Sequence, residues 1–329
     1  MKNKKILIID SLENMDNADS KLSVHTRNAL LLSKYLNCDV VGSKEYDFHV
    51  RKIINNRYDI IIFNYGSGYM EFKFIMDFCL KNKDTKYFLI QNEYNSKNPV
   101  LEKLAYRHNI KYKVISNYFS TNDTALFHYY YGKHFDEYTV LNLNAIIYEG
   151  KIEDDRVSGF FSAYKKENKI PIIYYGMFRT DRVKYFLKYF DEDFHVSVSP
   201  KRIRYYIDAG VTAKFIPPLK WAGNENRLFD VRSSLYIEDE FTHTNYNFLA
   251  NRFYEGLMYN VPLFFDKSCM NTIEKSGYPI DDYFIVDNKK ELMKKVNELN
   301  NYSYPQKMHD KARSERAEVL KKIKEYIGA

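Results

Sequence analysis

The sequence is poor in the features that mark secreted, membrane-spanning and disulfide-linked proteins. Its 329 residues include three cysteines, Cys38, Cys79 and Cys269, an odd number with no C-x-x-C pair. We therefore expect a protein of the reducing cytoplasm. No apolar run approaches the ~18 residues that cross a bilayer. The opening MKNKKILIID has the basic start of a signal peptide, but its apolar run stops at Asp10, which predicts a first strand of a soluble protein instead.

Several catalytic and metal-binding signatures are also missing. Histidines such as His128 and His134 lack the spacing of zinc ligands, and there is no nucleophile elbow of the G-x-S-x-G type. The YGSG stretch carries Gly66 and Gly68 but not the third glycine of a dinucleotide fingerprint. The DED run at 191–193 imitates an Asp-x-Asp metal motif, yet its place between a helix and a strand predicts an ordinary loop. These absences argue against a zinc enzyme, a serine hydrolase and a dinucleotide-dependent oxidoreductase.

The composition is that of a globular protein with an anionic partner. Hydrophobic residues make up 45% of the chain and charged residues 28%, so it can bury a core, and its length suits two domains. The net charge of +7 favours nucleic acid, a nucleotide or a membrane surface as the partner. A solvated basic surface would explain the same charge.

Apolar strands and amphipathic helices alternate along both halves of the chain. The strands expected in the first half are 4–10, 38–43, 58–68, 85–93 and 111–117, and those in the second half are 170–176, 193–199, 212–218, 233–239, 261–266 and 283–287. Continuous apolar strands separated by helices predict parallel sheets covered on both faces. The fold class is therefore α/β, with two Rossmann-like domains facing a cleft.

The domain boundaries follow from where this alternation is interrupted. We expect an amino-terminal Rossmann-like domain over 1–160, a linker over 161–170 and a second Rossmann-like domain over 171–305. The charged segment 306–329 predicts a long C-terminal helix that crosses back toward the first domain.

Parallel sheets bind ligands at the carboxyl ends of their strands, and two positively charged features fall there. Gly176, Arg179 and Arg182 follow a strand at the start of a helix, where backbone N–H groups and guanidinium groups suit a diphosphate. Arg252 and Glu255 lie one turn apart at the start of a helix that leads into the strand VPLFFD. A carboxylate there can hold a ribose diol, although a surface ion pair would also explain the spacing.

These stretches carry a resemblance to a known family. The segments IIYYGMFRTDR, DEFTHTNYNFLANRFYEGL and VPLFFD, with the tail from YFIVDNKKELMKKVNELNN onward, resemble the bacteriophage DNA β-glucosyltransferases. That family has the two-Rossmann GT-B fold and puts glucose from UDP-glucose on hydroxymethylcytosine in duplex DNA. The resemblance covers roughly the last 160 residues. It implies that Arg179, Arg182 and Arg252 hold the diphosphate of UDP, that Glu255 holds the ribose, and that the loop near Ile216 reads the uracil.

The amino-terminal half departs from that family at the catalytic positions. The resemblance places Asn92 where the family has its aspartate general base, and an amide accepts no proton at neutral pH. Glu93 is the nearest carboxylate and can serve as the base if the loop shifts by one residue, since a base needs about 3 Å reach to the hydroxyl. The alternative is a reaction with a different stereochemical course, or a different donor and acceptor. His25 stands where the family has an acidic residue touching the sugar, so the sugar itself can differ. Asp16 and Asp19 are the next candidates, and both Glu93 and His25 also fit plain surface positions.

A second basic group suits the acceptor. Lys201, Arg202 and Arg204 lie in PKRIRYY and could contact DNA phosphates, although a solvated helix face fits equally.

We therefore expect a phage enzyme that moves a sugar, glucose or a pentose such as arabinose, from a UDP-sugar to a hydroxyl on a modified pyrimidine in DNA. Such a modification protects DNA from host nucleases. UDP-sugar is the donor substrate, and double-stranded DNA with modified bases is the partner. No tightly bound cofactor, membrane or obligate protein partner is expected; a divalent metal is compatible with the reaction but is not required for donor binding. The alternatives are a bacterial GT-B glycosyltransferase acting on envelope glycan or lipid and a non-enzymatic DNA-binding protein.

Overall fold

The computed structural model describes most of the chain in two compact units. It describes residues 4–10, 24–42, 58–65, 84–91, 106–109, 111–117, 135–151, 169–219, 227–245, 247–300 and 302–329. One unit consists of Met1–Ile147 and Glu315–Ala329, and the other of Tyr148–Ser314. The expected domain boundary at 160 and most of the expected linker lie outside the described residues.

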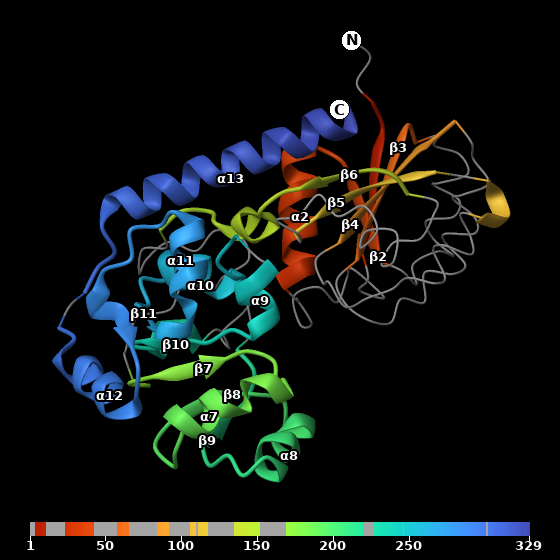
Figure 1. Cartoon of the computed structure of the whole chain (residues 1–329). Coiled ribbons are helices and arrows are strands. Elements are labelled where there is room, and N and C mark those ends of the chain that lie inside the picture. The colour runs from red at the N-terminus through yellow and green to blue at the C-terminus, as the bar shows by residue number, and fades with distance from the viewer. Residues whose placement is uncertain are drawn as a thin grey trace. The chain divides into compact units, whose positions relative to one another are not determined.

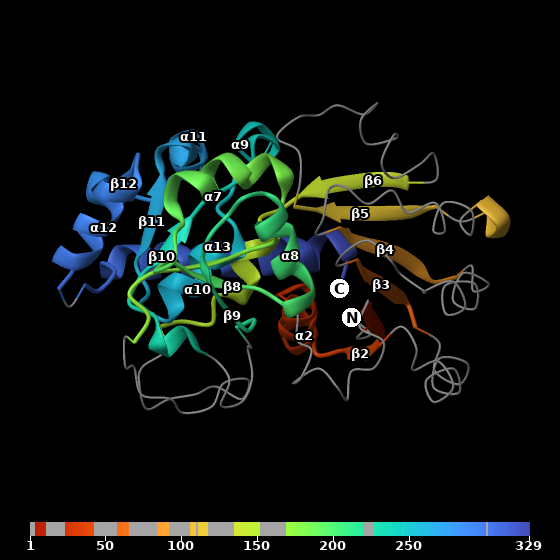
Figure 2. The ribbon, with the colours of Figure 1, turned by 90° about the horizontal axis from the view of Figure 1, so that it is seen from below.

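The first unit contains a six-stranded parallel sheet in the order β2-β1-β3-β4-β5-β6 (Figure 2). Its strands are β1 (Ile6–Asp10), β2 (Asp39–Gly42), β3 (Ile60–Tyr65), β4 (Lys86–Gln91), β5 (Tyr112–Ser116) and β6 (Phe135–Val140). Every residue of β1 is buried, as expected for a parallel strand that is covered on both faces. The order changes direction between β1 and β3, because β2 lies on one side of β1 and all later strands lie on the other.

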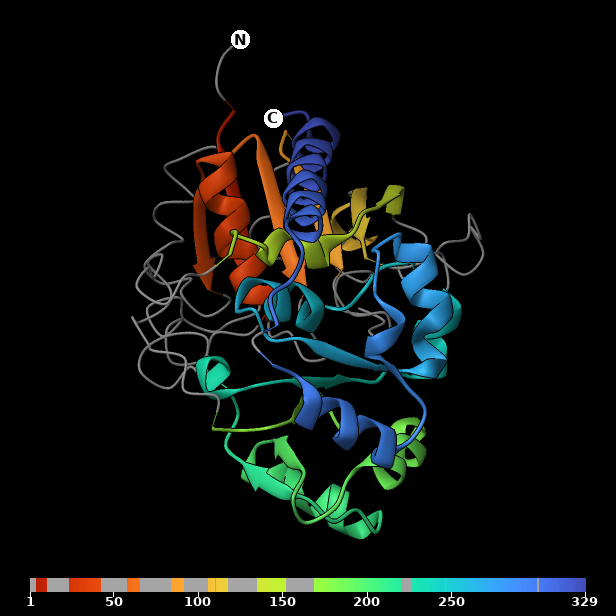
Figure 3. The ribbon, with the colours of Figure 1, turned by 90° about the vertical axis from the view of Figure 1, so that its left-hand side faces the viewer.

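The helical segments of the first unit include α2 (Val24–Leu36), the 3-10 helix η2 (Leu143–Ile147) and the last part of α13 (Gln306–Ile327). Helix α2 packs against β1, β2, β3 and η2 (Figure 3). The terminal helix α13 contributes its residues from Glu315 onward to this unit. There Arg316 Nε donates to the Ile146 carbonyl at 2.9 Å, and Asn142 Nδ2 donates to Glu315 at 2.7 Å.

The second unit also contains a six-stranded parallel sheet, in the order β12-β11-β10-β7-β8-β9 (Figure 1). Its strands are β7 (Ile173–Tyr175), β8 (His195–Ser197), β9 (Lys214–Ile216), β10 (Ser234–Tyr236), β11 (Leu263–Asp266) and β12 (Ile285–Val286). Here the direction changes between β7 and β10. The predicted α/β class with two Rossmann-like parallel sheets and a long C-terminal helix is confirmed.

The helices of the second unit follow the local signals of the sequence. They are α7 (Val183–Tyr189), α8 (Pro200–Asp208), α9 (Glu240–Asn245), α10 (Asn251–Met258), α11 (Met270–Ser276) and α12 (Lys289–Glu298), with 3-10 turns η3 (Thr180–Arg182), η5 (Arg227–Asp230), η6 (Lys267–Cys269) and η7 (Asp282–Phe284). Asn288 caps α12 by accepting from the Glu291 N–H, and Gly277 ends α11 in the left-handed conformation.

Helix α10 is shorter than its sequence pattern predicts, and this places its charged residues. The apolar periodicity suggests a helix from Asn245, but α10 begins at Asn251, because the N-cap residue Ala250 is extended and its N–H donates to Tyr236 Oη at 2.7 Å. Gly256 lets the helix press onto the start of β11, since a Cβ there would lie 2.8 Å from the Val261 carbonyl oxygen. Arg252 is therefore in the first turn of α10.

Candidate functional site

A cluster of buried charges lies at the carboxyl ends of β7 and β10. These two strands flank the point where the strand order of the second sheet changes direction, which is where open parallel sheets bind ligands. Gly176 directly follows β7, and Glu238 and Asp239 come two and three residues after β10. Both acidic side chains are buried, at 3% and 0% exposure.

Glu238 bridges two arginines that come from distant parts of the chain. Its Oε2 lies 2.6 Å from Arg182 Nη2, and its Oε1 lies 2.6 Å from Arg252 Nη2. Burial opposes the charged form of each arginine, but Glu238 and the other groups around them together outweigh it and raise the pKa of both above the ordinary value. Both arginines therefore stay charged although they are buried.

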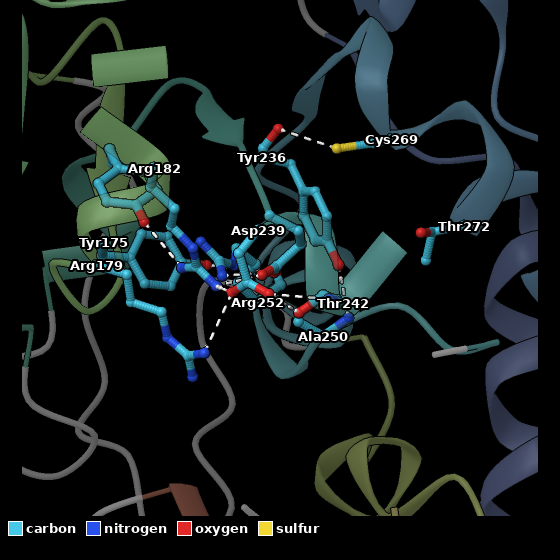
Figure 4. Close-up of polar contacts among 12 residues, drawn as sticks. Tyr175, Arg179, Arg182, Tyr236, Asp239, Thr242, Ala250, Arg252, Cys269 and Thr272 are labelled. Atoms are coloured by element: carbon cyan, nitrogen blue, oxygen red, sulfur yellow. Dashed lines mark hydrogen bonds and ion pairs between the residues drawn. The ribbon is translucent and has the colours of Figure 1, made fainter. Parts of the chain in front are cut away.

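Asp239 holds the remaining side of the cluster. Its Oδ2 lies 2.7 Å from Arg182 Nη2 and 3.3 Å from Arg179 Nη1, and its Oδ1 accepts from the backbone N–H and the hydroxyl of Thr242. Burial alone would raise the pKa of Asp239, but the Arg182 charge and the bonds from Thr242 lower it to about 2. Figure 4 shows Arg179 and Arg182 directed toward Asp239, with Arg252 beside them.

Arg252 is held so that one of its nitrogens faces the turn after β7. Its guanidinium lies over the rings of Tyr236, 5.1 Å from the centroid, and Tyr174, at 5.6 Å. A Cβ on Gly176 would lie 2.6 Å from Tyr174 Oη and 2.9 Å from Arg252 Nη1, so a larger residue there would push these two side chains away. Nη1 is buried and has no hydrogen-bond partner among the described residues.

The other residues of the predicted nucleotide site have distinct surroundings. Arg179 is partly exposed, whereas Arg182 is buried in two ion pairs and donates from Nη1 to Tyr174 Oη at 3.2 Å. Glu255 is buried, at 1% exposure, and is hydrogen-bonded to Tyr175. Burial, followed by the charge of Glu255, raises the pKa of the Tyr175 hydroxyl well above its ordinary value.

The structure brings together five of the predicted nucleotide-binding residues and leaves the sixth at the edge strand. Gly176, Arg179, Arg182, Arg252 and Glu255 gather around the ends of β7 and β10 and the start of α10. Ile216 ends β9, and its carbonyl accepts from the Val198 N–H at 3.0 Å. The predicted roles of these six residues toward a ligand stay predictions.

The predicted DNA-binding residues lie on α8 and are exposed. Lys201, Arg202 and Arg204 all point to solvent, and Arg204 Nε is 3.3 Å from Asp208 as an i,i+4 pair. Tyr205 on the same helix is also exposed and stacks on Phe178, with ring centroids 5.9 Å apart.

Of the predicted catalytic residues, the structure describes one. His25 lies in the first turn of α2 and is partly exposed. Asn92 and Glu93 follow β4 but lie outside the described residues, as do Asp16 and Asp19. In the second unit, the loop residue Asp191 pairs with Lys289, in agreement with the expectation of an ordinary loop.

Sequence reasoning missed Glu238 and Asp239, the residues that organise the cluster. Their signal is two acidic residues at the end of the short apolar run SLYI. An acidic pair at the end of a strand usually faces solvent, and its partners Arg182 and Arg252 are remote in the chain. The cluster could have been found only by predicting that the expected strands 170–176 and 233–239 pair with each other.

Neither metal-binding groups nor membrane-spanning helices emerge from the described residues. Within them, no three His, Cys, Asp or Glu side chains gather as metal ligands would. None of the helices in the described ranges combines the length and the apolar composition that crossing a membrane needs.

Comparison with known proteins finds a distant structural likeness. No family model matches the chain, and no curated protein sequence matches it. Among solved structures it is similar to the S. aureus MnaA–UDP co-structure, with 11% sequence identity, 99% of this chain and 97% of that chain covered, and a TM-score of 0.43. A likeness at this distance assigns no activity to the chain.

Proposed function

We propose that this protein is a UDP-sugar-dependent glycosyltransferase that transfers a sugar to a hydroxyl on a modified pyrimidine in DNA. The observation that carries the proposal is the approach of Arg252 Nη1 to the Gly176 turn, between segments 76 residues apart, at the switch point of the second sheet. A resemblance in sequence had placed both elements around the diphosphate of UDP. The sugar is glucose or a pentose such as arabinose.

The geometry divides the arginines into two roles. Arg182 is buried against two carboxylates, and recruiting it to a phosphate would break two ion pairs of 2.6 and 2.7 Å. Arg179 is partly exposed, and Arg252 presents Nη1 to the turn. We therefore assign the diphosphate to Arg179, Arg252 and the backbone after Gly176, while Arg182 fixes the carboxylates that orient them.

We assign the ribose and the uracil of UDP to residues near the same strand ends. Glu255, in the second turn of α10, takes the ribose hydroxyls, and the backbone around Ile216 takes the uracil. Three guanidinium groups lie against Glu238 and Asp239, and Glu255 adds a third carboxylate, so the diphosphate would be held by directed hydrogen bonds from Arg179 and Arg252.

We assign the proton transfer from the acceptor to Glu93 and the contacts with the DNA backbone to α8. In the proposed reaction the acceptor hydroxyl oxygen attacks the anomeric carbon, the bond to UDP breaks, and UDP leaves with the bonding electrons. Glu93 takes the hydroxyl proton. The acceptor base leaves the stack to reach the site, while Lys201, Arg202 and Arg204 contact DNA phosphates.

A transfer assay tests this function directly. The protein is incubated with UDP-glucose or UDP-arabinose and duplex DNA that carries hydroxymethylated, hydroxylated or unmodified pyrimidines, and the nucleosides are analysed by mass spectrometry. We expect a sugar adduct on a modified base and release of UDP. Transfer only to a glycan or lipid, or conversion of the UDP-sugar without any acceptor, would refute the DNA acceptor.

The same assay examines the base. Glu93→Gln is expected to keep UDP-sugar affinity and to lower kcat by roughly 10²–10⁴, the usual contribution of a general base. Near-normal turnover would exclude Glu93. Inversion at the anomeric carbon would agree with a relocated base, and retention would indicate a different mechanism.

A further inference from the structure

Helix α8 presents an exposed tyrosine beside basic residues. Tyr205 is 55% exposed, and Lys201 and Arg202, which precede it by four and three residues, are exposed as well. Residues three and four apart are neighbours on a helix surface, so the ring and the two cations share one face of α8. Asp208 follows three residues after Tyr205, but it is paired with Arg204 at 3.3 Å, which leaves the positive charge of the face in excess.

The exposed tyrosine ring is supported from one side. Phe178 stacks on Tyr205, with ring centroids 5.9 Å apart and an angle of 29° between the ring planes. Phe178 is itself held by Tyr206, edge to face at 4.9 Å, and by Phe186 at 6.0 Å. Tyr206 and Phe186 are both 0% exposed, so this support comes from the core of the second unit. One face of the Tyr205 ring therefore rests on a fixed neighbour, while the rest of the ring is open to solvent.

The supported ring belongs to the edge of the second sheet where ligands bind. Helix α8 begins after the carboxyl end of β8, and Phe178 follows the carboxyl end of β7. Open parallel sheets bind ligands at this edge. Phe178 also lies between Gly176 and Arg179 in the chain, so the Tyr205 ring adjoins the segment that is assigned to the diphosphate. All of these residues belong to one unit.

We propose that Tyr205 stacks on an unpaired base of the DNA acceptor, that Lys201 and Arg202 bind phosphates of the same strand, and that Phe178 positions the tyrosine ring. An aromatic ring beside cations suits an unpaired nucleotide, because the ring stacks on any base and the cations neutralise the backbone. A paired base has both faces covered by its neighbours in the duplex. The inference rests on the DNA acceptor of the proposed function, in which a base leaves the stack.

Removal of the aromatic ring tests the stacking contact. Fluorescence anisotropy measures the affinity for a fully paired DNA duplex and for the same duplex with a single unpaired thymidine. We expect the wild type to prefer the duplex with the unpaired base. Tyr205→Leu should weaken binding of that duplex by roughly five- to a hundredfold, the value of one base stacked on an aromatic ring, and leave the fully paired duplex nearly unaffected. Tyr205→Phe should keep the preference. Equal effects on the two duplexes, or loss of the preference in Tyr205→Phe, would overturn the proposal.

A matched variant and the salt dependence separate stacking from other effects. Tyr35→Leu is the control, because Tyr35 is 43% exposed in the last turn of α2, far along the helix from the carboxyl end of β1. Both variants should keep the wild-type melting temperature, since both rings are exposed, and only Tyr205→Leu should change DNA affinity. Stacking releases no counterions, so Tyr205→Leu should keep the wild-type slope of log K against log salt. A lower slope would show that the change acts through phosphate contacts and would overturn the stacking contact.

A double variant tests the positioning of the ring. Phe178→Leu alone should lower the preference for the unpaired base, because the Tyr205 ring loses its support. In the Tyr205→Leu background the same change should have no further effect on that preference, because it acts through Tyr205. Multiplied losses would refute the positioning role of Phe178.

These binding measurements need no sugar transfer, so the two proposals can fail separately. If the protein binds the unpaired base through Tyr205 but transfers no sugar to DNA, the proposed function fails and the stacking contact stands. If it transfers sugar to a modified base while Tyr205→Leu binds both duplexes as the wild type does, only this inference fails. Absence of DNA binding by the wild type would refute both.

Discussion

Arg252→Lys tests the proposed donor site most sharply. The native guanidinium makes two contacts in different directions, since Nη2 binds Glu238 at 2.6 Å and Nη1 faces the Gly176 turn. A lysine has a single ammonium group and cannot reach both places at once. We expect the ammonium to stay with Glu238, because leaving that carboxylate buried and unpaired would cost more. The contact toward the turn is then lost.

The size of the effect follows from the one contact that is removed. A hydrogen bond to a charged group contributes about 1.5–3 kcal/mol, so UDP should bind roughly ten- to a hundredfold more weakly. Uridine, which has no phosphate, should bind as before. The loss of the guanidinium above the rings of Tyr174 and Tyr236 will also lower stability somewhat, by about 1 kcal/mol.

Isothermal calorimetry with UDP, uridine and pyrophosphate measures these values. Arg204→Lys is the matched control, because this side chain is 85% exposed on α8 and the same change should leave all three affinities unaltered. UDP affinity equal to that of the wild type in a folded Arg252→Lys protein would refute a phosphate role for Arg252. Equal losses for UDP and uridine would instead place the damage at the nucleoside.

Further variants test the other assignments. Glu255→Ala should weaken UDP binding but spare pyrophosphate in the same calorimetric experiment, and equal losses would contradict a ribose contact. Lys201→Ser with Arg202→Ser should lower the slope of log K against log salt for duplex DNA by about 2, as measured by fluorescence anisotropy, and an unchanged slope would remove α8 from the DNA interface. Asp239 has its pKa lowered to about 2, so it contributes stability above about pH 4 that is lost as the pH falls toward 2, roughly 2 kcal/mol in total. Urea unfolding should show this loss of unfolding free energy at low pH in the wild type. Asp239→Asn should be less stable at pH 7, and its unfolding free energy should change less with pH. Parallel pH profiles of the two proteins would contradict the ion-pair account.

The sequence predicted the parts of the fold that depend on local pattern. Apolar runs such as ILIID in β1 and LFFD in β11 identify buried parallel strands because parallel strands are covered on both faces. Helix ends were less accurate, because the start of α10 depends on a hydrogen bond from the Ala250 N–H to Tyr236, a contact between remote segments. The role of Glu238 could not be predicted for the same reason, because its arginine partners come close to it only when β7 and β10 pair.

In both sheets a buried carboxylate near the end of a central strand fixes the start of a neighbouring helix. At each switch point a buried carboxylate lies at or just beyond the end of a central strand, Asp10 at β1 and Glu238 after β10. Each carboxylate holds an element that starts nearby, the first turn of α2 in one unit and Arg252 on α10 in the other. Asp10 belongs to the strand ladder and Glu238 lies two residues beyond it, so both carboxylates are held close to the sheet. A carboxylate is suited to this task because it accepts several hydrogen bonds at once.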